Sequence, residues 1–181
     1  MVLPIAPNPS LAVPLGERDH LIGPTDGKMV LVEYGDYQCP QCQLAALVVE
    51  ELIGKLGSEL TFAFRHFPLV RVHPDAHRAA QAAEAAGAQG KFWEMHRILY
   101  ERQEELGAER LLKYAAEIVL DVEQFGEELK SGKYMQRVQE DLAGGMRSGV
   151  SGTPTFFVRN KKFIGGYKFD ALLAALTARE G

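Results

Sequence analysis

Two cysteines separated by two residues, Cys39 and Cys42, have the clearest chemistry in the chain, and the sequence has no other cysteine. On a helix, thiols at this spacing lie about one turn apart, so they can close a disulfide with each other. A thiolate can also attack the disulfide of another molecule and exchange with it. A Cys-x-x-Cys pair beside a join between a strand and a helix favours such redox chemistry.

Three other interpretations of the cysteine pair stay open at this point. It could be half of a zinc site, although the chain lacks further cysteines and its histidines lack the spacing of a second half. It could be a structural disulfide, although so short a loop constrains the unfolded chain little. It could also be two unrelated thiols in the core. The position of the pair between a strand and a helix favours redox exchange over all three.

A buried strand followed by a helix positions the pair. Residues 30–32 (VLV) are apolar, as in a parallel strand that is buried on both faces. Pro40 suits the first position of a helix, and an apolar stripe at helical spacing continues to Leu52. Cys39 then lies where free N–H groups and the helix dipole favour a thiolate. Cys42 lies one turn deeper, so we expect Cys39 to attack and Cys42 to resolve.

Composition narrows the class of protein. The chain has 181 residues, 46% of them hydrophobic, and a formal net charge of −4. These values indicate one globular domain, with or without an insertion, and argue against a nucleic-acid partner. No run approaches the ~18 apolar residues of a membrane span. Residues 1–15 hold four prolines and no basic region, so they do not fit a signal peptide. We therefore expect a cytoplasmic protein, or an extracytoplasmic one whose leader was removed.

The rest of the chain predicts a small sheet interrupted by helices. Residues 60–65 alternate like a strand, so strand, helix and strand should form a right-handed parallel βαβ unit. Residues 74–149 are almost wholly helical in pattern, and residues 121–124 resemble a capping box. The expected helices cover 74 to Gly87 or Gly90, 91–105, 108–120, 121–132 and 133–142, the last continuing raggedly past Gly144-Gly145.

The C-terminal part predicts a hairpin and a helix. We expect a strand at 155–159, a turn at Asn160-Lys161, a partner strand at 162–164, and a last helix capped by Asp170. The fold class is therefore α/β. The expected division of the chain is a proline-rich arm at 1–18, a central domain at 19–73 and 150–181, and an inserted helical subdomain at 74–149.

Three local motifs add a resemblance to this pattern. They are residues 33–42 (EYGDYQCPQC), residues 65–69 (RHFPL) with 90–96 (GKFWEMH), and residues 149–156 (GVSGTPTF). With them the chain resembles, over residues 19–179, the DsbA-like branch of the thioredoxin superfamily, which consists of thiol–disulfide oxidoreductases. The resemblance implies a thioredoxin-like fold with an inserted all-helical subdomain.

The resemblance also implies a substrate-binding edge. Pro154 corresponds to a proline that is cis and lies beside the cysteine pair, and Thr153 would offer its backbone N–H and C=O to a substrate peptide. Pro40 and Gln41 would face the same substrate. No metal is implied, and no cofactor beyond the redox-active disulfide itself. The alternative is an ordinary trans proline at the first residue of a strand.

Glu33 corresponds to a buried acid of the family, six residues before Cys39. A carboxyl in an apolar strand is costly unless it has a task or a partner. Burial should raise its pKa, so that it could carry the proton of Cys42 during resolution. The alternatives are a glutamate that faces water at the strand end or one that pairs with Arg65.

Other polar and apolar residues carry weaker expectations. Four of the five histidines, His66, His73, His77 and His96, suggest capping and packing more than a metal site, so we predict no metal. Asp36 would raise the pKa of the nearby Cys39 if it were unpaired. An apolar surface on which an unfolded substrate could rest is expected near the thiols, formed by Tyr34, Tyr37, Phe67 and Leu69.

One departure from the family concerns the residues between the cysteines. The strongly oxidising DsbA type has Pro-His there, whereas this chain has Pro40-Gln41. Gln41 lacks a potentially cationic donor. We therefore expect a less acidic Cys39 and a less oxidising disulfide than in that type.

Together these observations predict an enzyme, a thiol–disulfide oxidoreductase of protein or peptide substrates that acts as a monomer. Thioredoxin, glutathione or a membrane oxidase would recycle it. The alternatives are a redox-switched binding or chaperone-like protein, a glutathione-dependent member of the same superfamily, and a metal-binding module. The second cysteine, Cys42, argues against a glutathione-dependent enzyme.

Overall fold

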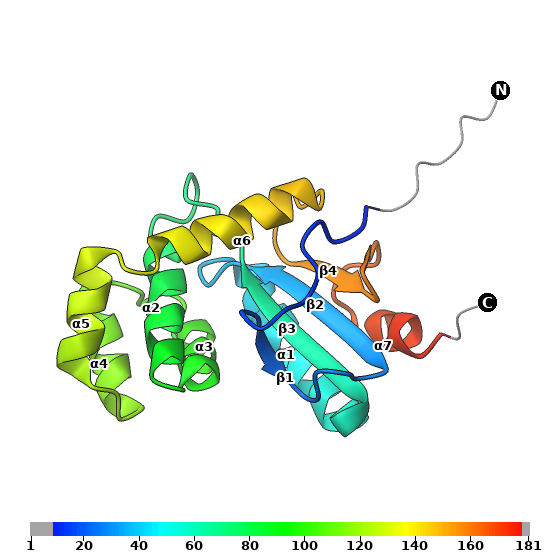
Figure 1. Cartoon of the computed structure of the whole chain (residues 1–181), viewed down its shortest axis with the longest axis horizontal. Coiled ribbons are helices and arrows are strands. Elements are labelled where there is room, and N and C mark those ends of the chain that lie inside the picture. The colour runs from blue at the N-terminus through cyan, green and yellow to red at the C-terminus, as the bar shows by residue number, and fades with distance from the viewer. Residues whose placement is uncertain (1–8, 179–181) are drawn as a thin grey trace.

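The computed structural model describes residues 9–178 and has a five-stranded mixed sheet at its centre (Figure 1). The strand order across the sheet is β1-β3-β2-β4-β5. Strands β2 and β3 are parallel, and the other neighbouring pairs are antiparallel. The strands are β1 His20–Ile22, β2 Met29–Gly35, β3 Leu60–His66, β4 Thr155–Val158 and β5 Lys161–Lys162.

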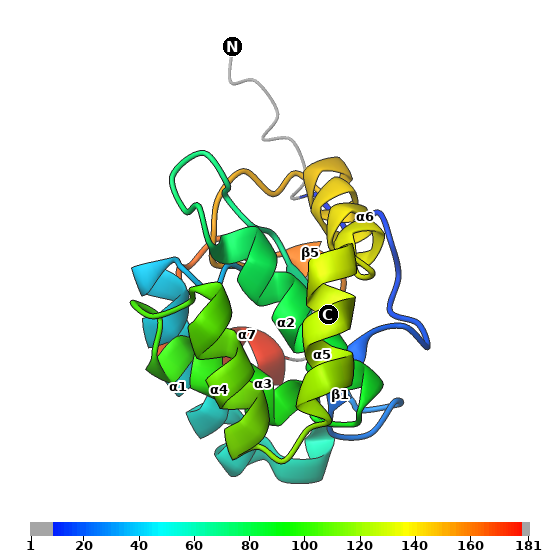
Figure 2. The same cartoon turned by 90° about the vertical axis from the view of Figure 1, so that its left-hand side faces the viewer.

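Two helices pack together on one face of the sheet, and five more are inserted between β3 and β4. The first two are α1 (Pro40–Leu56), which a short 3-10 turn (Gly57–Glu59) joins to β3, and α7 (Phe169–Thr177). Helices α2 to α5 group beside the sheet, and α6 runs from this group back toward β4 (Figures 1 and 2). The inserted helices are α2 Ala76–Ala88, α3 Phe92–Glu101, α4 Ala108–Glu117, α5 Val122–Ser131 and α6 Met135–Arg147.

Burial explains why β2 and β3 form the centre of the sheet. Every residue of β3 is buried. Successive side chains of a strand point to opposite faces. Leu31 of β2 therefore belongs to the large core under α1, whereas Val32 belongs to a second core that includes Leu11 and Val150. Each fully buried aliphatic side chain stabilises the fold by about 1.5–3 kcal/mol.

The predicted strand–helix–strand unit is confirmed, and so is the Asp121 half of the capping box, whereas the Gln124 side chain bonds to Glu128 instead of to the Asp121 N–H. The Asp121 carboxylate accepts a hydrogen bond of 3.0 Å from the backbone N–H of Gln124 at the start of α5. The helix ends at Gly132, which adopts a left-handed conformation with a φ of 68°. Glycine adopts this conformation without the steric cost that other residues have.

The predictions for the C-terminal hairpin and helix are partly wrong. The turn consists of Arg159 and Asn160, both with positive φ, and β5 begins at Lys161, one residue earlier than expected. Two left-handed residues match the twist of a two-residue hairpin. Asp170 does not cap α7. Lys168 precedes that helix without a side-chain cap, and Asp170 lies inside its first turn.

The N-terminal part of the described chain is attached to the sheet. The backbone N–H of Lys162 donates to the carbonyl of Pro9 (2.8 Å), and the N–H of Leu11 donates to that of Asn160 (3.0 Å). Residues 1–8 of the predicted arm lie outside the described residues. Strand β1 was not predicted, since the sequence around it shows only turn signals. Across residues 9–178, no helix combines the length and apolar character that crossing a bilayer requires.

Candidate active site

The two cysteines lie at the junction between β2 and α1. Cys39 precedes the first residue of the helix, Pro40, and is 7% exposed, whereas Cys42 is fully buried one turn later. Both are free thiols. Pro40 and Gln41 between them are exposed. The expected order of depth, with Cys39 nearer the solvent, is therefore confirmed.

The Cys39 sulfur is strongly acidic. A hydrogen bond from Cys42 is the largest influence, and it lowers the pKa of Cys39 to about 5 against the opposing effect of burial. Thr153 and the backbone of Cys42 and Gln41 add smaller effects in the same direction. The direction agrees with the prediction, but the partner thiol contributes more than the helix start.

Cys42 has the opposite character. Burial raises its pKa far above the ordinary value for a thiol, and the hydrogen bond to Cys39 and the nearby Glu33 act in the same direction. Cys42 therefore holds its proton while Cys39 holds the negative charge. This difference makes Cys39 the better nucleophile of the two.

Thr153 and Pro154 lie beside the thiols, as the resemblance implied. The Cys39 thiol is 3.4 Å from the carbonyl oxygen of Thr153, within hydrogen-bond geometry. The Thr153–Pro154 peptide bond is cis in the structure. Immediately after it β4 begins with Thr155, which pairs with Tyr34 of β2.

Glu33 is buried under the cysteine pair, with a relative exposure of 1%. Burial, followed by the charge of Cys39, raises its pKa to about 8. Neither alternative interpretation of Glu33 fits. It does not face water, and Arg65 pairs with Asp19 at 2.7 Å instead of with Glu33. The carboxyl is therefore protonated at neutral pH.

Asp36 fixes the turn between β2 and the cysteines. One carboxylate oxygen accepts from the N–H of Gln38 (2.7 Å), and the other binds the N–H of Leu69 (2.8 Å) and the ring of His73 (2.7 Å). The Asp36 carboxylate is therefore paired. The prediction that it would raise the pKa of Cys39 applied only to an unpaired carboxylate.

Gln103 is a site residue that the sequence did not reveal. It lies in the loop between α3 and α4, and its buried side-chain amide donates to the carbonyls of Tyr37 and Cys39, both at 2.9 Å. The inserted helical region thus contacts the cysteine turn directly. A glutamine in a loop over sixty residues away has no spacing or pattern that points to this contact.

The prediction of an apolar surface near the thiols is mostly wrong. Tyr34, Tyr37 and Phe67 are buried and at most 4% exposed, because they fill the cores on both faces of β2. Val70 and Val72, which lie in the loop whose ends Asp36 holds, are exposed, and so is Leu44, two residues after Cys42.

Two histidines belong to a buried polar cluster away from the cysteines. His20 and His66 each contact the same carboxylate oxygen of Glu84, at 3.0 and 2.8 Å. His66, Glu84 and Asp141 have potential ligand atoms within 4.8 Å of one another. Arg137 pairs with both carboxylates. Arg137 thus places one positive charge beside the two carboxylates of the cluster, which joins β1, β3, α2 and α6.

Comparison with known proteins identifies relatives by sequence family and by structure. The family model described as "Thioredoxin" matches residues 16–178. A thioredoxin-like oxidoreductase from Silicibacter pomeroyi has a TM-score of 0.78 and 26% identity, covering 88% of this chain and 91% of its own. The oxidised form of BdbD from Bacillus subtilis has a TM-score of 0.80 and 22% identity, with coverage of 95% and 97%. Alpha-DsbA1 from Wolbachia pipientis has a TM-score of 0.77 and 22% identity, with coverage of 92% for both chains.

Curated relatives share more sequence but are much longer. A protein named Na(+)/H(+) antiporter NhaA 1 from Salinispora arenicola is 46% identical over 169 residues, which is 93% of this chain and 26% of that protein. Another of that name, from Mycobacterium sp. strain KMS, is 42% identical over 164 residues, with coverage of 90% and 27%. The chain thus spans about a quarter of the length of these curated relatives.

Proposed function

We propose that this chain, which belongs to the thioredoxin family, is a thiol–disulfide oxidoreductase acting on protein or peptide substrates. One observation supports the proposal above all others. An acidic thiol, Cys39, lies immediately before α1, and a protonated second thiol, Cys42, is hydrogen-bonded to it. Thiol–disulfide exchange needs this arrangement. The thiolate can attack a substrate disulfide, and the second sulfur is within reach to attack the resulting mixed disulfide and release the substrate.

The reducing direction begins at Cys39. Its thiolate attacks one sulfur of a substrate disulfide, the substrate S–S bond breaks, and a mixed disulfide forms while the other substrate sulfur leaves as a thiolate. Cys42 then attacks the Cys39 sulfur, breaks the mixed disulfide and releases the second substrate sulfur. The substrate gains two electrons, and the Cys39–Cys42 pair is oxidised to a disulfide. The oxidising direction reverses these steps.

Glu33 supports the second step as a proton acceptor. In the mixed disulfide Cys39 carries no charge, so one of the two influences that raise the Glu33 pKa is gone. The carboxyl then ionises more readily and takes the proton of Cys42, which burial otherwise holds on the sulfur. We assign substrate contact to Pro40, Gln41, Thr153 and Pro154, which surround Cys39, with the backbone of Thr153 pairing with the peptide.

No cofactor beyond the Cys39–Cys42 disulfide is part of the proposal, and a partner thiol or disulfide must recycle the pair. Thioredoxin, glutathione or a membrane oxidase can each do this chemically. We propose a cytoplasmic site of action, with an extracytoplasmic one as the alternative. The reduction potential discriminates between them, because the cytosol keeps exposed disulfides reduced.

Two cysteine variants test the function. Cys39→Ser should abolish catalytic reduction of insulin by dithiothreitol, whereas Cys42→Ser should accumulate mixed disulfides with its substrates. Undiminished turnover by Cys39→Ser would refute the proposal. A parent protein that cycles between dithiol and disulfide but never turns over insulin would instead favour a redox-switched binding protein, and turnover only with glutathione would favour a glutathione-dependent enzyme.

A further inference from the structure

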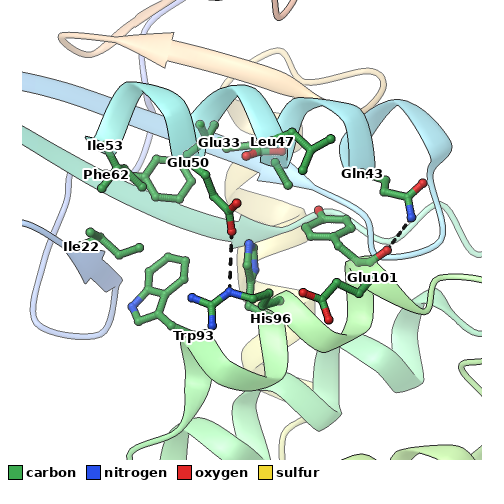
Figure 3. Close-up of a pocket in the computed structure, with 14 residues that line it drawn as sticks. Ile22, Glu33, Gln43, Leu47, Glu50, Ile53, Phe62, Trp93, His96 and Glu101 are labelled. Carbon is green, nitrogen blue, oxygen red and sulfur yellow. Dashed lines mark hydrogen bonds and ion pairs between the residues drawn. The ribbon is translucent and has the colours of Figure 1, made fainter. Parts of the chain in front are cut away.

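A pocket of about 510 Å³ opens on the α1 side of the sheet, behind the cysteine pair. Figure 3 shows it between α1, which contributes Gln43, Leu47 and Glu50, and α3, which contributes Trp93 and His96. The sheet closes its floor. This volume falls in the range of about 300–1,000 Å³ that small-molecule sites have.

The walls of the pocket are apolar and its mouth is charged. Ile53, Phe62 and Trp93 line the interior, and Leu47 at the rim is 63% exposed. At the mouth, Arg97 of α3 and Glu50 of α1 approach to 3.7 Å. Such walls favour a flat apolar body over a polar one.

Two buried polar atoms of the lining lack partners. Oε1 of Glu33 and the hydroxyl of Tyr100 make no hydrogen bond in the described structure, although the two residues are only 1% and 4% exposed. A buried polar group without a hydrogen-bond partner has a free-energy cost to the folded protein. A bound molecule that hydrogen-bonds to these two atoms would remove that cost.

The polar groups of the lining near Glu33 are neutral at physiological pH. Burial raises the pKa of Glu33 to about 8 and lowers that of His96 to about 3. The pKa of the Tyr100 hydroxyl is raised well above its usual value, again by burial first. None of these three groups offers a charge to an ionised head group, and Cys39, whose charge acts on Glu33, does not line the pocket.

We propose that this pocket binds a small neutral aromatic molecule whose head group both donates and accepts hydrogen bonds, with the ring against Phe62 and Trp93 and the head group at Glu33 and Tyr100. The site is separate from the peptide edge at Thr153. Its occupancy is nonetheless linked to the thiols, because Glu33 belongs to both.

This link rests on the proposed function. The Cys39 charge is one of the influences that keep Glu33 protonated, and it disappears when the disulfide forms. A ligand at Glu33 therefore meets different protonation in the two redox states near pH 8 and should bind them with different affinity. By reciprocity, the ligand then changes the redox equilibrium by the same factor.

Benzamide is the probe, and the single tryptophan of the chain reports on it. Trp93 lines the pocket and donates its indole N–H to the carbonyl of Leu21 (3.2 Å), so it gives one indole signal in a ¹H–¹⁵N NMR spectrum. Benzamide should shift this signal saturably, whereas benzoate and benzylammonium, charged molecules of similar size, should not. A shift that never saturates would overturn the site in favour of a pocket that holds only water. Equal binding of the charged probes would overturn the proposed preference for a neutral head group.

Tyr100→Phe is the matched variant. It removes a hydroxyl without a partner, so folding should be preserved, and benzamide affinity should fall about two- to tenfold, the equivalent of one hydrogen bond. Tyr134→Phe removes a hydroxyl outside the lining and should leave the affinity unchanged. Unaltered affinity in Tyr100→Phe would contradict the placement of the head group.

The redox link and the pocket can fail separately. Cys39→Ser cannot exchange disulfides but should still bind benzamide. Benzamide binding by this variant would therefore support the pocket even if the proposed function were refuted. Equal affinity of the dithiol and disulfide forms of the parent at pH 8 would remove the link alone.

Discussion

The pKa values of Glu33 and Cys39 are shifted in opposite directions, although the cysteine pair influences both. The hydrogen bond from Cys42 lowers the pKa of Cys39 to about 5, and burial with the Cys39 charge raises that of Glu33 to about 8. Between these values the dithiol form has its negative charge on the sulfur and its proton on the carboxyl. In the proposed mechanism, Cys39 is thus ready as the nucleophile before substrate arrives, and Glu33 becomes ready as the base only after Cys39 has reacted.

Glu33→Gln should become progressively more stable than the parent, in the reduced state, as pH rises from 4.5 to about 8. The folded parent keeps the proton of Glu33, while the unfolded chain loses it near pH 4.5. The contribution of Glu33 to the free energy of unfolding of the parent is fully present below pH 4.5. Between pH 4.5 and the folded pKa it falls by about 1.4 kcal/mol per pH unit, roughly 4–5 kcal/mol in all. Glutamine has no such loss.

Urea unfolding of the fully reduced parent and variant at several pH values measures this difference. Cys39 has a depressed folded pKa, so its own contribution is present at high pH and lost as pH falls through about 5. That contribution is common to both proteins and cancels in the comparison. A difference in stability that does not change with pH would show that Glu33 is ionised or exposed.

At the scale of elements, Gln103 joins the inserted helices to the cysteine turn. Its loop follows α3, and its two hydrogen bonds end on the carbonyls of Tyr37 and Cys39, both within the β2–α1 join. Asp36 holds the same turn from the other direction through the loop that contains Leu69 and His73. The geometry of the thiols thus depends on both segments and not on α1 alone.

Gln103→Leu should therefore raise the pKa of Cys39 as well as destabilise the fold by about 1–3 kcal/mol, the cost of a buried carbonyl left unpaired. The pH dependence of Cys39 alkylation by iodoacetamide measures the pKa. Gln89→Leu is the control, because Gln89 makes two similar bonds to the backbone of Asp121, away from the turn. Gln89→Leu should reduce stability without moving the pKa. An unchanged alkylation profile in Gln103→Leu would limit Gln103 to a structural role.

The sequence predicted elements where one periodic pattern dominates and missed those that depend on tertiary contacts. The apolar run of β2, the stripe of α1 and the cap at Asp121 are local signals, and all three are confirmed. Strand β1 is only three residues long and exists because it pairs with β3. Gln103 is the same case within the site, since its partners are distant in sequence. Cys39, Cys42 and Glu33 could be found because their spacing is local.

At the scale of the whole molecule, the reduction potential of the Cys39–Cys42 pair depends on all the contacts that stabilise the Cys39 thiolate. A lower thiol pKa stabilises the dithiol form and makes the disulfide more oxidising, as the comparison of thioredoxin (pKa about 7) with DsbA (about 3.5) indicates. Cys39, with a pKa of about 5, lies between them. Gln41 supplies no positive charge to the thiolate, whereas the hydrogen bond from Cys42 and the turn held by Gln103 stabilise it.

We therefore expect the Cys39–Cys42 pair to have a potential between about −270 mV, the value of thioredoxin, and about −120 mV, that of DsbA. Equilibration with glutathione buffers, followed by the fluorescence of Trp93 or by acid trapping of the thiols, measures it. Gln41→His should move the potential toward the oxidising end, because a cationic ring at the helix start would favour the thiolate further. A parent potential at or below that of thioredoxin would mean that the Cys39 thiolate is less stabilised than its contacts indicate, and would favour a reductant of the cytoplasm. A potential near that of DsbA would favour an oxidant working outside it.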